Sequence, residues 1–271
     1  MKKNGSTILL VIILLIGLSL LLYPSFADWW NSFTQSRAIA TYTEAVAKID
    51  DDQYAELWDA AWEYNETITA RPNIFFLSEE EKEVYHSHLN IGGNGVMGYI
   101  EIPEIKVTIP IYHGTDEAVL QIAVGHLEWS SLPVGGPGSH CVLSGHRGLP
   151  SARLFTDLDK IQEGDIFLLR VLDEVLTYEV DQIRIVLPHE VEALNILEGE
   201  DLCTLVTCTP YGVNSHRLLV RGRRIENQAE VREVRVTADA IQIRPATVAP
   251  FLAAPMLLLL LIGLMLPKRK K

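Results

Sequence analysis

The chain has 271 residues, of which 48% are hydrophobic, with 35 acidic against 23 basic residues and a net charge of −12. Its length accommodates one domain of roughly 200 residues plus additional segments. Six of the basic residues and none of the acidic ones lie near the two ends, so the middle of the chain carries about −18. Such a segment is a poor candidate for binding nucleic acid or anionic lipid, whereas a basic peptide or a protein amine suits it.

Two uncharged apolar runs lie near the termini. The first spans residues 6–23 and follows Lys2 and Lys3, and the second spans residues 246–266 and precedes the basic residues 268–271. Each run is about long enough to cross a bilayer, and basic flanks mark the cytoplasmic side. We therefore expect a two-pass protein of the cell membrane, with both termini cytoplasmic and the middle of the chain extracellular.

Two alternatives remain open for these ends. Residues 25–27, Ser-Phe-Ala, resemble a small-x-small cleavage site, so the first run is also compatible with a signal peptide. The second run with its basic tail is compatible with a wall-sorting tail, but no Leu-Pro-x-Thr-Gly sequence precedes it, which argues against that interpretation.

The three cysteines, Cys141, Cys203 and Cys208, are an odd number for an extracellular segment. At least one of them must remain a thiol or pair between chains. Cys203 and Cys208 differ by five positions, so on one strand they point to opposite faces and do not pair. The positions of His140, Cys141 and His146 do not have zinc-ligand spacing, and we expect neither a metal nor a cofactor.

Residues 28–68 are predicted to be helical, because neither Pro nor Gly falls between Pro24 and Pro72. Asp50, Asp51 and Asp52 interrupt the apolar pattern, which indicates a break between two helices. The apolar stripe is expected to pack on the main domain or to form a stalk, and it consists of Ile39, Tyr42, Val46, Ile49, Leu57, Trp58 and Trp62.

Further along the chain, short helices and turns are expected. Ser78 followed by Glu81 has the pattern of a capping box, which predicts that a short helix begins there. Residues 91–95, Ile-Gly-Gly-Asn-Gly, predict a turn. Asp116 is expected to cap a short helix that runs through Ala123.

Alternating or apolar segments bounded by turn residues predict about seven strands between residues 96 and 223. Two of them are expected to form a hairpin around Asp173 and Glu174. So many strands with few helices indicate a compact β-barrel or sandwich. The predicted strands span residues 96–102, 106–112, 139–144, 165–172, 175–187, 203–208 and 215–223.

Cys208 ends one predicted strand, and Arg217 comes early in the next, after a turn with the sequence Thr-Pro-Tyr-Gly-Val-Asn. An adjacent cation lowers the pKa of a thiol, and an Arg aimed at the same place stabilises an acyl oxyanion. His146 lies between two glycines at the end of a predicted strand, where its side chain can reach a cleft. The plain alternative also stands, with Cys208 a small buried strand residue and Arg217 a solvated charge.

With these parts in place, the sequence resembles the sortases, and within them the pilin-polymerising class C type. The resemblance spans roughly residues 94–225, and its most specific segments are residues 95–100, 132–136, 143–150 and 204–212. It implies a mainly β fold, an eight-stranded sortase-type β-barrel with N-terminal helices and a transmembrane helix at each end. It also implies that Cys208 is the nucleophile, His146 the general acid/base, and Arg217 the residue that stabilises the oxyanion or positions the substrate.

The chain departs from the class C pattern in one place. Relatives of that class usually cover the cleft with a lid loop that carries Asp-Pro followed by an aromatic residue. The equivalent loop of this chain carries Arg71, Pro72 and Asn73, followed by Phe75 and Phe76. An Asp that pairs with Arg217 is missing, so a lid latch is expected to be different or weaker. Either of the two phenylalanines covers Cys208, or it packs into a surface groove as a linker aromatic.

The resemblance also implies an activity. The expected enzyme is a cysteine transpeptidase that cleaves a Leu-Pro-x-Thr-Gly-like sorting signal between Thr and Gly and transfers the acyl group to a pilin lysine. Its partners are then pilin or surface-protein substrates, an amine acceptor and the membrane, and nucleic acid is not among them. Alternatives are a housekeeping-type sortase that uses a cell-wall precursor amine, a thiol peptidase, and a non-catalytic binding module tethered to the membrane.

On this interpretation the chain divides into five parts. They are an N-terminal anchor or uncleaved signal (1–27), a helical region with the lid-like loop (28–93), the catalytic barrel (94–226), a linker (227–245), and a C-terminal transmembrane helix with its basic tail (246–271).

Overall fold

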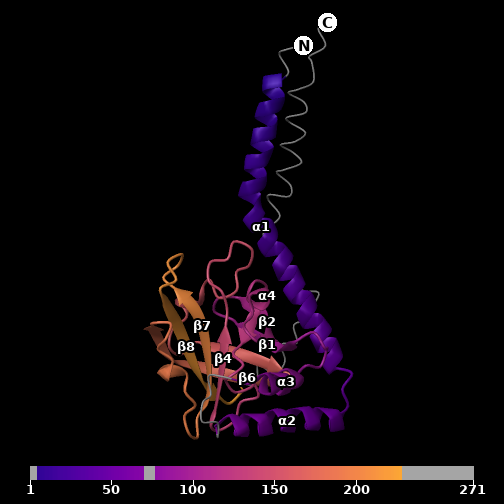
Figure 1. The fold of residues 1–271 in the computed structure, drawn as a ribbon, viewed down its shortest axis with the longest axis vertical. Coiled ribbons are helices and arrows are strands. Elements are labelled where there is room, and N and C mark those ends of the chain that lie inside the picture. The colour runs from indigo at the N-terminus through magenta and orange to yellow at the C-terminus, as the bar shows by residue number, and fades with distance from the viewer. Residues whose placement is uncertain (1–4, 70–76, 228–271) are drawn as a thin grey trace.

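The fold is that of a computed structural model, which describes residues 5–69 and 77–227. In this part of the chain, eight strands form a closed barrel in the order β1-β2-β3-β4-β7-β8-β6-β5 (Figure 1). The expected eight-stranded barrel is therefore confirmed. The strands are β1 (Val96–Ile102), β2 (Val107–His113), β3 (Val124–His126), β4 (Ser139–Ser144), β5 (Ile166–Val171), β6 (Glu174–Val186), β7 (Asp201–Thr209) and β8 (His216–Ile225).

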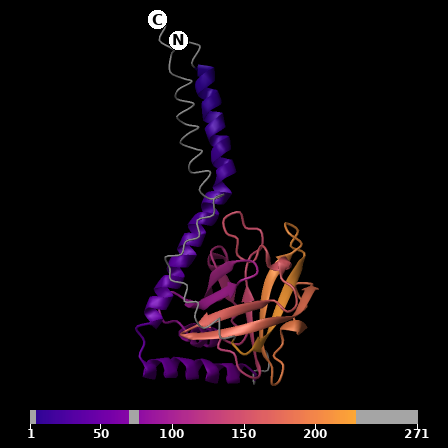
Figure 2. The ribbon, with the colours of Figure 1, turned by 180° about the vertical axis from the view of Figure 1, so that it is seen from behind.

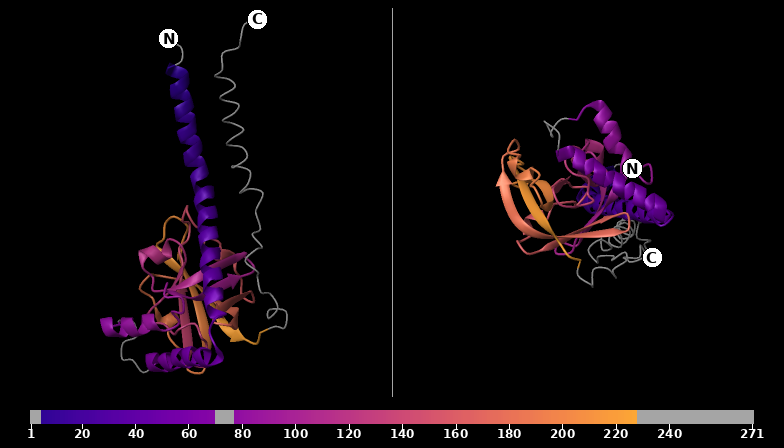
Figure 3. Two further views of the ribbon diagram at one scale, coloured as in Figure 1. Left: turned by 90° about the vertical axis from the view of Figure 1, so that its right-hand side faces the viewer. Right: turned by 90° about the horizontal axis from the view of Figure 1, so that it is seen from below.

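Helices precede the barrel and connect parts of it. They are α1 (Gly5–Val46), α2 (Asp51–Thr69), α3 (Glu79–Ser87) and the short α4 (Glu117–Leu120), with 3-10 turns at Leu158–Lys160 and Glu192–Leu194. The predicted break between two helices is confirmed, because α1 ends at Val46 and α2 begins at Asp51, so Asp50 lies in the break while Asp51 and Asp52 open the second helix. The lower half of α1 lies along the barrel, and its upper half projects beyond it (Figure 3).

The first apolar run and the helix that follows it form a single helix. Pro24 lies inside α1, and Figure 1 shows that this helix bends partway along its length. Proline removes one backbone hydrogen bond and clashes with the preceding turn, which kinks a helix without necessarily ending it.

Three local predictions can be compared with the structure. The capping box is confirmed, since the Ser78 side chain accepts from the Glu81 amide and the Glu81 side chain accepts from Ser78. The predicted cap at Asp116 is wrong in detail, because its side chain makes no capping hydrogen bond and α4 ends at Leu120. The hairpin turn is shifted by one residue, because β6 already begins at Glu174 and Leu172 takes the left-handed conformation with φ of 52°.

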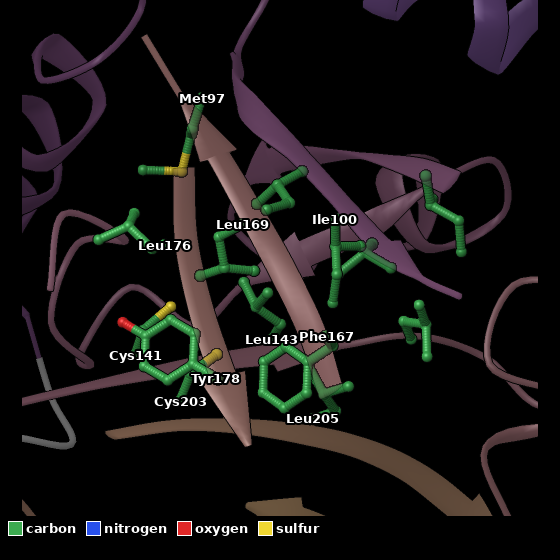
Figure 4. Close-up of a cluster of buried hydrophobic side chains, with 14 of the residues drawn as sticks. Met97, Ile100, Cys141, Leu143, Phe167, Leu169, Leu176, Tyr178, Cys203 and Leu205 are labelled. Atoms are coloured by element: carbon green, nitrogen blue, oxygen red, sulfur yellow. The ribbon is translucent and has the colours of Figure 1, made fainter. Parts of the chain in front are cut away.

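The barrel interior is the main hydrophobic core. Figure 4 shows part of it, where Cys141, Cys203 and Tyr178 lie close together. The helices add to the same core through Tyr85 of α3 and through Ala61, Tyr64 and Ile68 of α2. Most of the predicted helical stripe packs against this core, and Tyr42 is only 2% exposed.

Trp62 is an exception in that stripe. Its side chain is 39% exposed, and its ring lies against Gly136, where a Cβ atom would come within 2.8 Å of the ring. This residue therefore covers the glycine-rich loop before β4 and is not part of the core.

A second, smaller apolar cluster lies on the outside of the barrel. It joins Val142 of β4, Val206 of β7, Leu219 of β8 and Leu194 of the loop between β6 and β7. Leu205, Leu218 and Val220 belong to the interior core instead. This alternation confirms the predicted strand character of both segments and defines which side chains face outward.

The apolar N-terminal segment is confirmed as helix. In the described residues, one helix, α1, is long and apolar enough to cross a membrane. The second expected span, residues 246–266, and the residues of the expected lid, Arg71, Pro72, Asn73 and Phe75, lie outside the described residues.

The two ends of the barrel differ in what surrounds them. The loop after β4 and the loop between β7 and β8 lie at the end toward the projecting half of α1 (Figures 1 and 2). Helix α2 crosses near the opposite end. There the Asn65 side chain donates to the backbone oxygen of Leu132 and accepts from its amide.

Candidate active site

Cys208 and Arg217 are direct neighbours across two strands. In the antiparallel pair of β7 and β8, Cys208 lies opposite Arg217, and Thr209 lies opposite His216. Side chains opposite each other in such a pair share one face of the sheet. Both are partly exposed. Cys208 is the second-to-last residue of β7, whereas the sequence pattern predicted the last.

The Cys208 side chain belongs to the outer face of the barrel. Val206, two residues earlier, lies in the outer apolar cluster, whereas Cys203 and Leu205 lie in the interior. Because side chains alternate along a strand, Cys208 shares the outer face with Val206. The interpretation of Cys208 as a fully buried core residue does not fit this arrangement.

His146 lies beside the same end of β7. Strands β4 and β7 are parallel, and Ser144 lies opposite Val206. The Gly145 amide donates to the Val206 oxygen at 3.1 Å, and the Thr207 hydroxyl donates to the Gly145 oxygen at 2.7 Å. Continuing this register by two residues sets His146 level with Cys208. Strand β7 lies between β4 and β8, so the segment that carries His146 and the strand that carries Arg217 flank the end of β7 that carries Cys208.

The glycines on either side of the Gly-His-Arg-Gly segment have identifiable roles. A Cβ atom at Gly145 would come within 2.8 Å of the Phe155 ring. Gly148 takes φ of +77°, and a Cβ atom there would come within 2.6 Å of the Tyr211 ring. The first glycine therefore admits a core aromatic beneath the His146 backbone, and the second allows the β7–β8 loop to pack against this segment.

Arg147 is a residue whose role the sequence did not reveal. Its Nη1 donates to the Thr209 hydroxyl at 3.2 Å, and its Nη2 donates to Asp159 at 2.5 Å. Its side chain is 9% exposed. Arg147 follows His146, and Thr209 follows Cys208, so this contact ties together the two segments that carry them. The signal in the sequence was a charged residue between the histidine and the second glycine.

The guanidinium of Arg217 is oriented by its own loop. Its Nη1 donates to the backbone oxygens of His216 at 3.1 Å and Asn214 at 3.3 Å. Asn214 takes a positive φ of 59°, which turns the chain back into β8. The loop therefore supplies acceptors that hold the cation at the edge of the strand pair.

The other two cysteines differ sharply from Cys208. All three are thiols. Cys141 and Cys203 lie opposite each other in the β4–β7 pair and are 2% and 0% exposed. Burial raises the pKa of the Cys203 thiol well above its ordinary value. The Cys203 thiol is therefore a poor nucleophile, because the thiolate is the reactive form.

The described residues contain no group of three or more His, Cys, Asp or Glu side chains that could hold a metal ion. A cavity of about 650 Å³ lies elsewhere, between Trp62, the glycine-rich loop 135–138 and residues 195–199. It opens where β4 and β7 begin, at the opposite end of these strands from Cys208. It is therefore separate from the candidate site.

Comparison with a family model agrees with this arrangement. Residues 100–225 match the model described as Sortase domain, a segment that contains His146, Cys208 and Arg217.

Solved structures extend the similarity over more of the chain. Sortase C1 of Streptococcus agalactiae is 50% identical with a TM-score of 0.69, and the match covers 71% of this chain and 100% of that one. Sortase C of Streptococcus pneumoniae is 44% identical with a TM-score of 0.63, covering 71% and 98%. Sortase C-1 of Actinomyces oris is 44% identical with a TM-score of 0.60, covering 64% and 99%.

Curated relatives match over shorter segments. Sortase A of Streptococcus agalactiae is 32% identical over 117 residues, which are 42% of this chain and 47% of the relative. Sortase D of Bacillus subtilis is 30% identical over 131 residues, which are 47% and 63%. The chain thus spans about half to two thirds of the length of the curated relatives that it matches.

Proposed function

The chain belongs to the sortase family, and from this premise we propose that it is a membrane-anchored cysteine transpeptidase that assembles pilins. Its substrates are proteins with a C-terminal Leu-Pro-x-Thr-Gly-like signal, and its acceptor is a lysine amine of another pilin subunit. The observation that supports the proposal is the order of β4, β7 and β8, in which Cys208 lies opposite Arg217 and the segment after β4, with His146, runs beside the same end of β7.

In the first half of the reaction, the Cys208 thiolate attacks the carbonyl carbon between Thr and Gly of the signal. Negative charge develops on the carbonyl oxygen, and the Arg217 guanidinium donates to it. Removal of one such donor typically costs about 3–4 kcal/mol of barrier height. As the C–N bond breaks, His146 delivers a proton to the glycine nitrogen, because an amine leaves poorly without one. The product is a thioester between the Thr carbonyl and Cys208.

In the second half, an amine replaces the departed peptide. The lysine amine attacks the thioester, His146 accepts its proton, and the sulfur leaves as a thiolate. The bond that forms is an isopeptide bond, and the enzyme returns to its initial state. The outer apolar cluster with Val206 continues the face on which Cys208 lies, and its buried members support that face from beneath.

The choice of a pilin as substrate is supported by the solved structures. Sortases of the C type from Streptococcus agalactiae, Streptococcus pneumoniae and Actinomyces oris match over 98–100% of their chains, and a sortase A of Corynebacterium diphtheriae matches over 95% of its chain. The work on the Streptococcus pneumoniae protein concerns pilin substrate specificity. Anchoring is supported by α1. The second membrane span, the cytoplasmic position of both termini, and a lid formed by residues 71–75 remain part of the proposal.

The curated relatives favour a second candidate. Several of them are sortase A proteins, so a housekeeping sortase that anchors surface proteins to a cell-wall precursor is the alternative acceptor chemistry. The two candidates share the first half-reaction and differ in the amine.

A reconstitution experiment separates them. The full chain is incubated in membrane vesicles with a signal-bearing pilin and a cell-wall precursor amine, and the products are resolved on a denaturing gel. We expect a ladder of covalent multimers that depends on pilin lysines. Single products joined to a precursor amine, with no ladder, would favour the housekeeping reaction, and hydrolysed pilin alone would indicate a thiol peptidase.

A further inference from the structure

The candidate site lies at the end of the barrel that points along α1 toward its apolar half (Figures 1 and 2). We propose that this end rests on the bilayer surface, with Tyr211 and Val213 of the β7–β8 loop in contact with the lipid headgroup region. The inference rests on the proposed anchoring by α1 and is independent of the acyl-transfer chemistry.

The lower half of α1 is fixed to the barrel by hydrogen bonds. The Asn31 side-chain amide donates to the Ser151 backbone oxygen at 2.7 Å. The Asp28 carboxylate accepts from the Arg153 backbone amide at 3.0 Å. One turn beyond Asn31, the Gln35 side-chain amide donates to the Ile122 backbone oxygen at 2.6 Å. These contacts leave the helix little freedom to swing, so the orientation of the barrel follows from that of α1.

The barrel-side helix is fixed again near its end. The Tyr42 hydroxyl donates to the Met97 oxygen at 2.9 Å and accepts from the Leu172 amide at 2.7 Å. Tyr42 is 2% exposed. The docked part of α1 therefore extends from Asp28 to Tyr42, about 20 Å of helix at 1.5 Å per residue.

An aromatic cluster marks where α1 leaves the membrane. Phe26, Trp29, Trp30 and Phe33 are 46%, 39%, 55% and 45% exposed, and their rings contact one another with centroids 5.8–6.5 Å apart. Trp and other aromatic residues gather at the membrane–water boundary, where their rings lie at headgroup level. Asp28 and Asn31 lie on the same helix turns as these aromatic residues. The loop with Ser151 and Arg153, to which they are bonded, therefore lies at headgroup level too.

The tip of the β7–β8 loop is apolar and exposed in the same region. Tyr211 is 61% exposed and Val213 is 71% exposed. The Tyr211 ring packs against Gly148, in the segment between His146 and Ser151, which places the tip beside the loop held by α1. Exposed large apolar side chains next to a membrane anchor are suited to contact with the interface. No charge accompanies them at positions 210–215, which removes the main cost of entering this layer.

The proposal has a direct test with spin labels. The full chain carrying Cys208→Ala is reconstituted into vesicles of phosphatidylcholine and phosphatidylglycerol. A nitroxide is attached at Val213→Cys or, as a matched control, at Val84→Cys. Val84 is also exposed, at 51%, but it lies on α3, away from the apolar half of α1 (Figure 1). Cys141 and Cys203 are buried and do not take the label.

Collision of each label with oxygen, which concentrates in lipid, is compared with its collision with a water-soluble nickel complex. We expect an oxygen-to-nickel ratio several-fold higher at position 213 than at position 84. Equal ratios in a chain that resists alkaline extraction would overturn the inference and leave the anchoring intact. Release of the chain by alkaline extraction would overturn the anchoring and the inference together. Because Cys208 is absent from both variants, neither result depends on the transfer reaction.

Discussion

Cys203 and Cys208 are five residues apart in one strand, yet they occupy opposite chemical environments. Cys203 faces the barrel interior beside Cys141 and Tyr178, is fully buried, and has its thiol pKa raised by burial (Figure 4). Cys208 faces outward, is partly exposed, and lies opposite Arg217. Their odd separation of five positions decides this difference, because a strand alternates its faces with a period of two. Strand register therefore decides the environment of each thiol as much as residue type does.

The largest expected effect comes from removing the outward thiol. Cys208→Ala should abolish release of the glycine-terminal fragment from a Leu-Pro-x-Thr-Gly peptide, because the covalent step loses its nucleophile. Chromatography of the cleaved peptide measures this, with Cys203→Ala as the matched control. Retained turnover in the Cys208 variant, or its loss in a folded Cys203 variant, would reverse the comparison of the two thiols.

His146→Ala should be nearly as damaging. A positioned acid or base contributes on the order of 10²–10⁴-fold to rate, and this histidine follows Gly145, whose amide is bonded to Val206 of the strand that carries Cys208. The exposed His189→Ala, in the loop after β6, serves as control. Steady-state rates on a fluorescence-quenched signal peptide measure both variants, and equal rates would remove His146 from the mechanism.

Arg217→Ala should lower the rate by about 10²–10³-fold through loss of an oxyanion donor. Arg217→Lys should recover only part of it, since the ammonium keeps the charge but not the planar fork. Arg223→Ala is the control, because Arg223 lies on the same strand but pairs with Glu200 and Asp181. A rate for Arg217→Ala within a few-fold of that for Arg223→Ala would contradict the assigned role.

For the inward thiol, the expected effect is on stability and not on rate. Cys203→Ala deletes one fully buried atom from the core, which should lower the free energy of unfolding by about 1–2 kcal/mol. Peptide turnover by the folded fraction should stay unchanged. Urea unfolding monitored by circular dichroism, together with the turnover assay, tests both parts.

The smallest expected effect concerns His140, which shares the β4–β7 pair. Its Nδ1 lies 2.8 Å from the Asn195 oxygen and its Nε2 lies 2.7 Å from the Thr204 hydroxyl. Burial lowers the pKa of His140, the Asn195 hydrogen bond opposes this, and Arg221 and Asp181 add smaller opposing effects. The fold thus holds the neutral imidazole. The contribution of neutral His140 to the free energy of unfolding is full above the ordinary pKa of about 6.5 and is lost as the pH falls below that value.

Unfolding free energies measured at about pH 8 and about pH 5 test this contribution. We expect His140→Gln to lose less stability on acidification than the parent chain. His189→Gln, at an exposed position, should leave the pH dependence as it is. An identical loss in the parent and in His140→Gln would contradict the expectation.

Most of the strands, and the proximity of Cys208 to Arg217, could be predicted from the sequence. Alternation in residues 203–208 and 215–223 predicted two strands, which the structure confirms as β7 and β8. Period-two alternation also predicted the opposite faces of Cys203 and Cys208. These predictions succeed because one face of a barrel strand is buried and the other is not. The alternation of residue types along the sequence therefore shows which side chains share a face.

Other features depend on contacts between distant segments, and the sequence pattern did not contain them. Strand β3 has only three residues, Val124–His126, too few for a periodic signal, and it is defined by pairing with β2 and β4. The Arg147 contact to Thr209 joins residues 62 positions apart. The docking of α1 on Ser151 joins residues 120 positions apart. Such contacts arise from the closure of the barrel.

Intact-protein mass spectrometry tests the central claim most directly. The chain is mixed with a signal peptide, the reaction is quenched in acid, and the adduct is located by peptide mapping. The account predicts an added mass equal to the acyl part of the signal, ending at Thr, as a thioester on Cys208 and absent from Cys203 and Cys141. An adduct on either interior cysteine, or product formation without any adduct while Cys208→Ala remains active, would contradict it.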